Sequence, residues 1–378
     1  MRLSLSTLVS STALAATALA TPIATKLDKR ADFVKRTDDL VWKGNSTLPK
    51  VLVYTDYATA ASGSTNAVTD TSAYGQITRN ASEVLEAIPE VYDVAQIAVK
   101  YITSGIRGGI NTGSYDYLAL SLAKYVDYAL CHEGSDIDGA VFIHGTNLLE
   151  ETAFLADVTV SCDKPVVATG SMRPFTDVGY EGNANIYSAF TLAVAPDAAG
   201  RGTMIAFNDR IVPAHWAMKF NGNTPDAFKA YEQGNLGMFV NHMPIFYSTP
   251  SLPAGKTVFP IQHIEELPKV DILYVHREQD IRLLNASVAL GAQGVVFDGT
   301  GSGAITRDDG SVADFVAQGI QVVTATRTPT GMSVPSLSSA PNHAQSGFLV
   351  ANGYNMTNTI KLFEGHIRQS LGPGYTLA

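Results

Sequence analysis

The chain has 378 residues, of which 46% are hydrophobic and 16% charged, and its formal net charge is -9. This length is enough for one large or two ordinary globular domains. The negative charge and the absence of a basic run argue against nucleic-acid binding, so we expect a small-molecule partner.

The N-terminus has the features of a targeting segment. Met1-Arg2 precedes an apolar, Ala-rich run that ends in Ala18-Leu19-Ala20, which predicts a signal peptide over residues 1–20. Two dibasic pairs then predict a processed pro-segment over residues 21–36, with an exposed charged linker as the alternative. No other apolar run is long enough to span a bilayer, so we expect a secreted protein without a membrane partner.

Sequons and cysteines agree with secretion. Four N-x-S/T sequons predict a glycoprotein, and they lie at Asn45, Asn80, Asn285 and Asn355. The chain has two cysteines, Cys131 and Cys162. Two cysteines in an oxidising compartment suggest one disulfide, and two buried free thiols are the alternative.

Apolar runs alternate with helical stretches, which predicts parallel sheets with helices on both faces. In the first half we expect strands at 50–54, 139–143, 165–169 and 203–208, and helices at 82–88, 116–130, 148–157 and 183–195. The segment from about 215 to 260 is rich in Asn, Gly, Pro and aromatic residues and is interpreted as a connection.

The alternation then restarts, which indicates a second domain. Strands are expected at 270–275, 295–298 and 321–326, and helices at 287–290, 312–317 and 358–371. We therefore predict an α/β protein with an N-terminal domain at 37–248, a linker at 249–268 and a C-terminal domain at 269–378.

The most informative stretch is VFIHGTNLLEETAFL, residues 141–155. An apolar strand runs into the polar turn His144-Gly145-Thr146-Asn147, and a helix follows with Glu150 and Glu151 in its first turn. Acidic side chains suit the positive end of a helix dipole. A strand, a tight turn and a helix N-terminus together form a geometry that binds anions and oxyanions.

This turn is one of several motifs that together resemble the bacterial-type L-asparaginase/glutaminase family. The other motifs, in chain order, are Gly113-Ser114-Tyr115-Asp116 and residues 162–167, 170–174, 181–189, 201–202, 208–209, 266–270 and 328–331. The resemblance covers almost all of the mature chain. It implies a large, doubly wound parallel-sheet domain, a smaller flavodoxin-like domain, and assembly as a homotetramer built as a dimer of dimers.

The resemblance also implies amide hydrolysis of asparagine- or glutamine-like substrates through a threonine nucleophile. Aligning the first loop without a gap places Tyr57 at the nucleophile position, and a shifted alignment places Thr59 there. Tyr74 then matches the activating tyrosine. Thr146 matches the second threonine of the family's site.

Three further residues match the family's substrate-binding positions. Ser114 matches the residue that binds the substrate carboxylate. Tyr115, beside it, is expected to narrow the substrate pocket at that side. Asn147 stands where the family has an aspartate that holds the substrate's α-ammonium. A neutral acceptor here weakens recognition of an ammonium by about 1.5–3 kcal/mol.

Two other charges of the family's site have no counterpart in this alignment. Counting from Asn185-Ile186-Tyr187 places Pro196 at the position of the family's lysine, so we expect Thr146 to lack a nearby cation. No Asp or Glu occurs between Gly331 and Gly353, where a neighbouring subunit's glutamate is expected.

Metal, nucleotide and serine-hydrolase motifs are missing, so we expect no metal and no cofactor. Two hypotheses follow for the function. The first is a secreted asparaginase-type amidohydrolase with weak or altered activity. The second is a catalytically silent member of the family, a pseudoenzyme, that binds a small neutral ligand or a protein partner.

Overall fold

The computed structural model describes residues 40–55, 59–70, 78–101, 116–253, 256, 258–265, 267–331, 333–334 and 342–343. The predicted signal peptide and pro-segment, the predicted helix at 358–371 and the sequon at Asn355 lie outside these ranges. No helix in the described part of the chain is long and apolar enough to cross a bilayer.

The largest sheet in the described residues has eight strands in the order β10-β9-β6-β5-β4-β3-β1-β2. Strands β2, β1, β3, β4 and β5 run parallel to one another, and β6, β9 and β10 continue the sheet in antiparallel fashion. The strands are β1 (Lys50–Thr55), β2 (Gln96–Tyr101), β3 (Gly139–Ile143), β4 (Val166–Thr169), β5 (Thr203–Phe207), β6 (Arg210–Pro213), β9 (Gly237–Val240) and β10 (Met243–Phe246).

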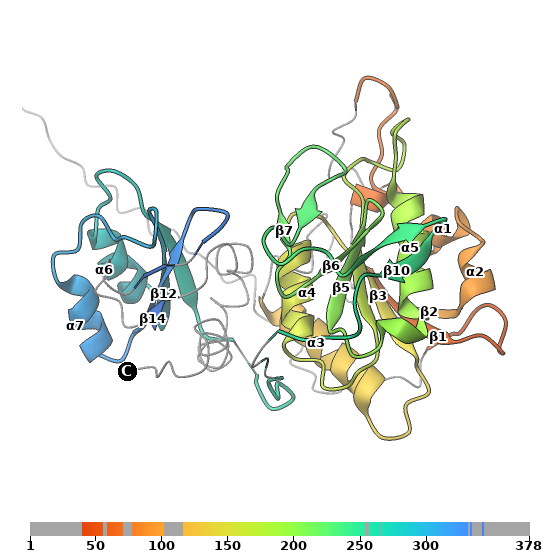
Figure 1. The fold of residues 1–378 in the computed structure, drawn as a ribbon, viewed down its shortest axis with the longest axis horizontal. Coiled ribbons are helices and arrows are strands. Elements are labelled where there is room, and N and C mark those ends of the chain that lie inside the picture. Colours follow the sequence, from red (N-terminus) through yellow and green to blue (C-terminus); the bar gives the residue numbers. More distant parts are fainter. Residues whose placement is uncertain are drawn as a thin grey trace, which may run out of the picture.

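Helices cover both faces of this sheet, because successive side chains of a buried strand point to opposite faces. Leu52 and Phe142 pack on the side of α3 (Asp116–Cys131) and α4 (Leu149–Asp157). Val51 and Val141 pack on the side of α1 (Ala81–Glu86), α2 (Val91–Val94) and α5 (Gly182–Ala193). Figure 1 shows these two layers of helices on either side of the sheet.

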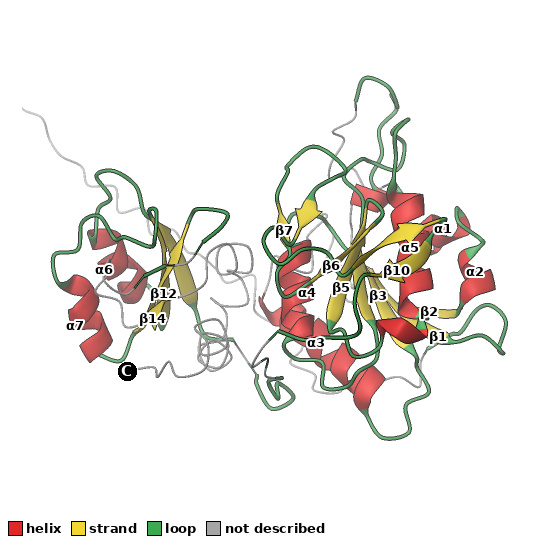
Figure 2. Cartoon of the chain, in the orientation of Figure 1, coloured by secondary structure: helices red, strands yellow, loops and turns green. Residues whose placement is uncertain are grey.

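The smaller sheet has four strands in the order β11-β12-β13-β14, all of them parallel. They are β11 (Val270–Tyr274), β12 (Gly294–Gly299), β13 (Gln321–Thr326) and β14 (Asn342–His343). Helices α6 (Arg282–Ala289) and α7 (Ser311–Ala317) pack on one face of it (Figure 2). Apolar residues of the other face form a cluster with α3, α4 and the segment that joins the two sheets.

These two sheets confirm the predicted α/β class and its two parallel-sheet units. The predicted strands at 139–143 and 321–326 match β3 and β13 at both ends. The interpretation of residues 215–260 as a connection is wrong, because this segment also holds β9, β10 and the short hairpin of β7 (Met218–Lys219) and β8 (Phe228–Lys229). These strands are too short to give a recognisable period, and β9 begins with a glycine.

A disulfide joins Cys131, the last residue of α3, to Cys162 in the loop before β4. The alternative of two free thiols is therefore wrong. The bridge closes a loop around β3 and α4, with a sequence separation of 31 residues. The same loop is closed in the unfolded chain, which lowers the conformational entropy of that chain.

We expect the Cys131→Ala/Cys162→Ala double variant to be less stable by about 3–4 kcal/mol, from the entropy of closing a loop of this length. Urea unfolding followed by tryptophan fluorescence measures this effect, because both tryptophans, Trp42 and Trp216, lie in the large domain. Unchanged stability of the double variant would contradict the expectation.

A buried ionic cluster anchors the C-terminal end of α4. Asp157 accepts hydrogen bonds from Lys256 Nζ at 2.7 Å, His215 Nδ1 at 3.0 Å and the backbone N–H of Thr203 at 2.8 Å. The side chains of Asp157, Lys256 and His215 are each at most 5% exposed. Burial by itself raises the pKa of Asp157, but Lys256 and His215 outweigh it and lower the pKa below its usual value.

We expect Asp157→Ala to cost about 3–5 kcal/mol, because it leaves the Lys256 ammonium buried without its partner. The folded-state pKa of Asp157 is lowered, so its stabilisation is complete above the unfolded-state pKa and is lost as the pH falls through the folded-state value. Urea unfolding by tryptophan fluorescence at several pH values tests this. The control is Asp226→Ala, which removes the partly exposed ion pairs of Asp226 with Arg210 and Lys229, each worth at most about 1 kcal/mol, and an equal loss in both variants would refute the role of burial.

Candidate active site

The order of the large sheet has its switch point between β1 and β3. After β1 the chain adds β2 on one side, and β3 lies on the other, so the order of the sheet reverses between them. Ligands of open α/β sheets bind at such a switch point. Thr55 and Ile143, the last residues of β1 and β3, lie side by side, so the two loops that follow leave the sheet at the same place.

The turn after β3 is held rigidly. The backbone N–H of His144 donates to Thr169 at 2.9 Å, which ties the turn to β4. The His144 ring contacts the carbonyl of Gly145 through Nδ1 at 2.8 Å and the hydroxyl of Thr152 through Nε2 at 3.1 Å. Because a carbonyl only accepts, Nδ1 donates to Gly145, and Nε2 pairs with the Thr152 hydroxyl. Thr146 is thereby fixed in a buried position, 6% exposed.

A lysine lies directly beside Thr146. Lys219, on β7, donates from Nζ to Thr146 Oγ1 at 2.9 Å and to Asn147 Oδ1 at 3.2 Å. The expectation that Thr146 lacks a nearby cation is therefore wrong. Pro196, to which the alignment assigned the family's lysine, starts a short 3-10 helix. Burial lowers the pKa of Lys219, and the charge of Glu150 partly opposes this.

Glu150 completes the group of ionisable residues. It lies in the first turn of α4, is 8% exposed, and its Oε1 accepts from the backbone N–H of Lys219 at 3.3 Å. Its other oxygen, Oε2, is buried without a hydrogen-bond partner. Burial raises the pKa of Glu150 to about 7, with Lys219 and backbone hydrogen bonds acting in the opposite direction.

The predicted site residues are only partly described. Thr146 and Asn147 lie together with Lys219, and Asn147 is exposed. Thr59 starts the 3-10 helix Thr59–Ala61, where it is half-buried and its carbonyl accepts from Ser62 at 3.0 Å. Tyr57, Tyr74, Ser114 and Tyr115 lie outside the described residues. The roles given to these residues, and the choice between Tyr57 and Thr59, stay predictions.

Lys219 and the role of Glu150 were missed by the sequence reasoning. Counting from Asn185-Ile186-Tyr187 led to Pro196, although Lys219 is the first lysine after the matched pair Asn208-Asp209. Glu150 was interpreted only as a partner of the helix dipole, because burial of a carboxyl cannot be read from its position in a first turn.

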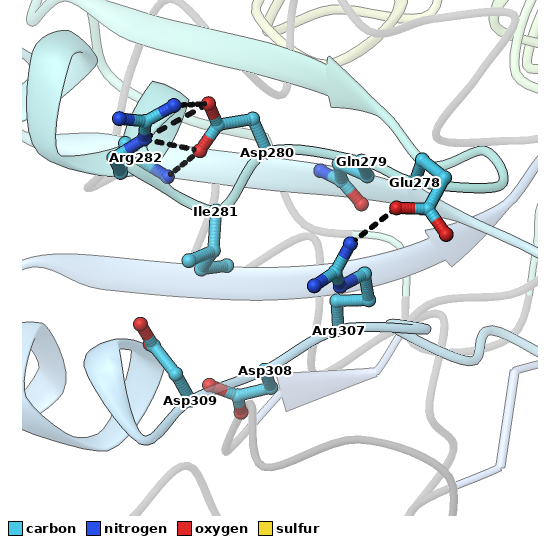
Figure 3. Close-up of a pocket in the computed structure, with 8 residues that line it drawn as sticks. All are labelled: Glu278, Gln279, Asp280, Ile281, Arg282, Arg307, Asp308 and Asp309. Atoms are coloured by element: carbon cyan, nitrogen blue, oxygen red, sulfur yellow. Dashed lines mark hydrogen bonds and ion pairs between the residues drawn. The ribbon is translucent and has the colours of Figure 1, made fainter.

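A separate hollow of about 500 Å³ lies in the smaller domain, between residues 278–282 and 307–309. Figure 3 shows that its charges pair with one another, Arg282 with Asp280 and Arg307 with Glu278. It is formed by different loops from those that hold Thr146. In the described ranges no three His, Cys, Asp or Glu side chains gather in a way that could hold a metal ion.

Comparison with known proteins identifies the family. A family model for the N-terminal asparaginase domain matches residues 58–252, and a model for the glutaminase/asparaginase C-terminal domain matches residues 269–362. L-asparaginase 2 of Bacillus subtilis is 35% identical over 82% of this chain and 80% of its own length. Probable L-asparaginase 4 of Schizosaccharomyces pombe is 34% identical over 84% of this chain and 90% of its own length.

A solved structure agrees with these matches. The crystal structure of a probable cytoplasmic L-asparaginase from Campylobacter jejuni superposes with a TM-score of 0.70 at 27% identity, covering 85% of this chain and 99% of that one. The two family models together match more than half of the chain, in the same order as its two sheets. The chain belongs to the asparaginase family.

Proposed function

We propose that this protein hydrolyses the carboxamide of small asparagine- or glutamine-like substrates, and that the pair of Thr146 and Lys219 carries the chemistry. The contact of 2.9 Å between Lys219 Nζ and Thr146 Oγ1 is the observation on which this rests. A threonine hydroxyl is a weak nucleophile until a neighbouring base takes its proton, and a half-buried lysine with a lowered pKa can be such a base.

The reaction that fits this pair has two steps. Neutral Lys219 takes the proton of Thr146 Oγ1 as that oxygen bonds to the amide carbon. The resulting Lys219 ammonium gives this proton to the amide nitrogen as the C–N bond breaks, so that ammonia leaves and the lysine is neutral again. Water then attacks the resulting ester, which releases the carboxylic acid and restores the threonine. Thr59 remains the alternative nucleophile, with Tyr74 as its activating residue and Thr146 in the supporting role.

Asn147 bears on the choice of substrate. It is neutral and exposed, and its oxygen already accepts from Lys219 at 3.2 Å. A charge-assisted hydrogen bond is about twice as strong as a neutral one. Asn147 therefore binds an α-ammonium group more weakly than an aspartate at the same position would. We propose altered selectivity, with free L-asparagine favoured less over analogues that lack the α-ammonium.

We also propose that the protein is secreted and forms a homo-oligomer. The disulfide between Cys131 and Cys162 supports an oxidising compartment, since such bridges rarely persist in the cytosol. The exposed Asn45, Asn80 and Asn285 of three sequons are compatible with glycosylation.

The purified protein is expected to release ammonia from L-asparagine or L-glutamine, measured by a coupled ammonia assay. Lys219→Met and Thr146→Ala should each lower kcat by roughly 10²- to 10⁴-fold, because each removes one half of the proton transfer. Lys229→Met is the matched control, since Lys229 lies on the paired strand β8 and contacts Asp226 instead. Full activity of Lys219→Met would refute the proposed pair, and no release by the unaltered protein would favour the silent family member.

Asn147→Asp is expected to tighten binding of L-aspartate by roughly 10- to 100-fold, because a carboxylate replaces a neutral acceptor facing the α-ammonium. Binding of succinate, which lacks that ammonium, should not improve. Isothermal titration calorimetry measures both, with the exposed Asn223→Asp as the control for added charge. Equal gains in the two variants would show that position 147 does not face the ligand.

A further inference from the structure

Helix α4 carries a buried carboxyl near each end, and the two have opposite environments. Asp157 has three hydrogen-bond donors within 3.0 Å and a lowered pKa. Glu150 accepts a hydrogen bond from the Lys219 backbone at 3.3 Å, has a buried oxygen without a hydrogen-bond partner, and has a raised pKa. A poorly satisfied buried carboxyl destabilises a fold, so stability alone does not account for Glu150.

We propose that Glu150 is the positioning residue of the site, which fastens Lys219 beside Thr146 and controls whether its amine is protonated. This proposal rests on the function proposed above. The hydrogen bond from the Lys219 backbone to Glu150 Oε1 joins β7 to the start of α4. The same lysine then reaches Thr146 and Asn147 through Nζ.

The charge of Glu150 acts directly on Lys219. Lys219 is the charged residue on β7 whose field lowers the pKa of Glu150, and Glu150 is the carboxylate that raises the pKa of Lys219. On its own helix Glu150 is followed by Glu151, and His144 in the preceding turn contacts Gly145 and Thr152. On the paired strand β8, Lys229 contacts Asp226.

Protonation of Glu150 or Lys219 therefore changes the pKa of the other group. When Glu150 is ionised, it favours the ammonium form of Lys219, which donates to Thr146 and cannot take its proton. When Glu150 takes up a proton, the neutral amine becomes more accessible and can accept the hydroxyl proton of Thr146. The Glu150 carboxyl can thus change the protonation state of Lys219, which the neutral side chain of Asn147 cannot do.

The pKa of Lys219 tests this without any enzyme activity. In the full chain labelled with 13Cε-lysine, two-dimensional NMR against pH gives the titration of each lysine, and Lys219→Arg assigns the signal. Glu150→Gln should lower the pKa of Lys219 by about one unit, because it removes the opposite charge. Glu151→Gln, the matched control, should leave it unchanged. An unchanged value in folded Glu150→Gln would overturn the proposal.

The pH profile of kcat/KM supplies the second test. The unaltered protein should show an inflexion near pH 7, where Glu150 titrates, and Glu150→Gln should lose it while Glu151→Gln keeps it. A merely structural role would lower activity at every pH without moving the profile, and that result would also overturn the proposal. Should the protein release no ammonia, the proposed function fails, and the NMR titration still decides on the Glu150–Lys219 coupling.

If Glu150→Gln does not fold, infrared difference spectroscopy of the unaltered protein takes its place. The band of a protonated buried carboxyl should disappear as the pH rises through about 7. The 13Cε chemical shift of Lys219 should show a step over the same pH range. A Lys219 signal without this step would contradict the coupling.

Discussion

The candidate site depends on one long-range contact, the one between Lys219 and Thr146, which are 73 residues apart in the chain. Two separate features bring them together. The parallel strands β1, β3 and β4 fix the turn that carries Thr146 at the point where the order of the sheet reverses. Lys219 lies outside that sheet, on a hairpin of two residues a strand whose Phe228 packs into the core beside the large sheet. The hydrogen bond from the Lys219 backbone to Glu150 joins this hairpin to the helix that follows Thr146.

The two ends of α4 show how burial alone fails to define the state of a carboxyl. Asp157 and Glu150 are almost equally inaccessible, at 4% and 8% exposure. Asp157 faces Lys256 and His215 and stays ionised with a lowered pKa, so it contributes to stability. Glu150 faces a lysine whose ammonium is directed elsewhere, to Thr146 and Asn147, and it keeps a raised pKa. Perturbed carboxyls of the second kind cluster at functional sites, where a group must change its charge near neutral pH.

The sequence predicts the fold well where local pattern and burial agree. Both ends of β3 and β13 follow from short, fully buried apolar runs between polar turns. The hairpins between 215 and 260 could not be found in this way, because their strands have two to four residues and alternate only weakly. Thr146 and Asn147 could be predicted because they sit within one continuous motif. Lys219 could not be placed by counting residues, since the position of its amine depends on tertiary contacts between β7, α4 and the turn after β3.

Because Lys219 contacts Asn147, the asparagine at position 147, where the family has an aspartate, affects the lysine as well as the substrate. An aspartate at this position would hold the lysine as an ammonium and would also attract the ammonium of a substrate. The asparagine oxygen accepts the lysine's hydrogen bond at 3.2 Å but adds no negative charge. Under the proposed function, the neutral Asn147 would weaken the attraction for a charged substrate and would let Lys219 give up its proton more easily, as burial already favours. Weaker binding of an amino acid and activation of Thr146 would then both follow from the same missing charge, with Glu150 as the buried carboxylate that acts on the lysine.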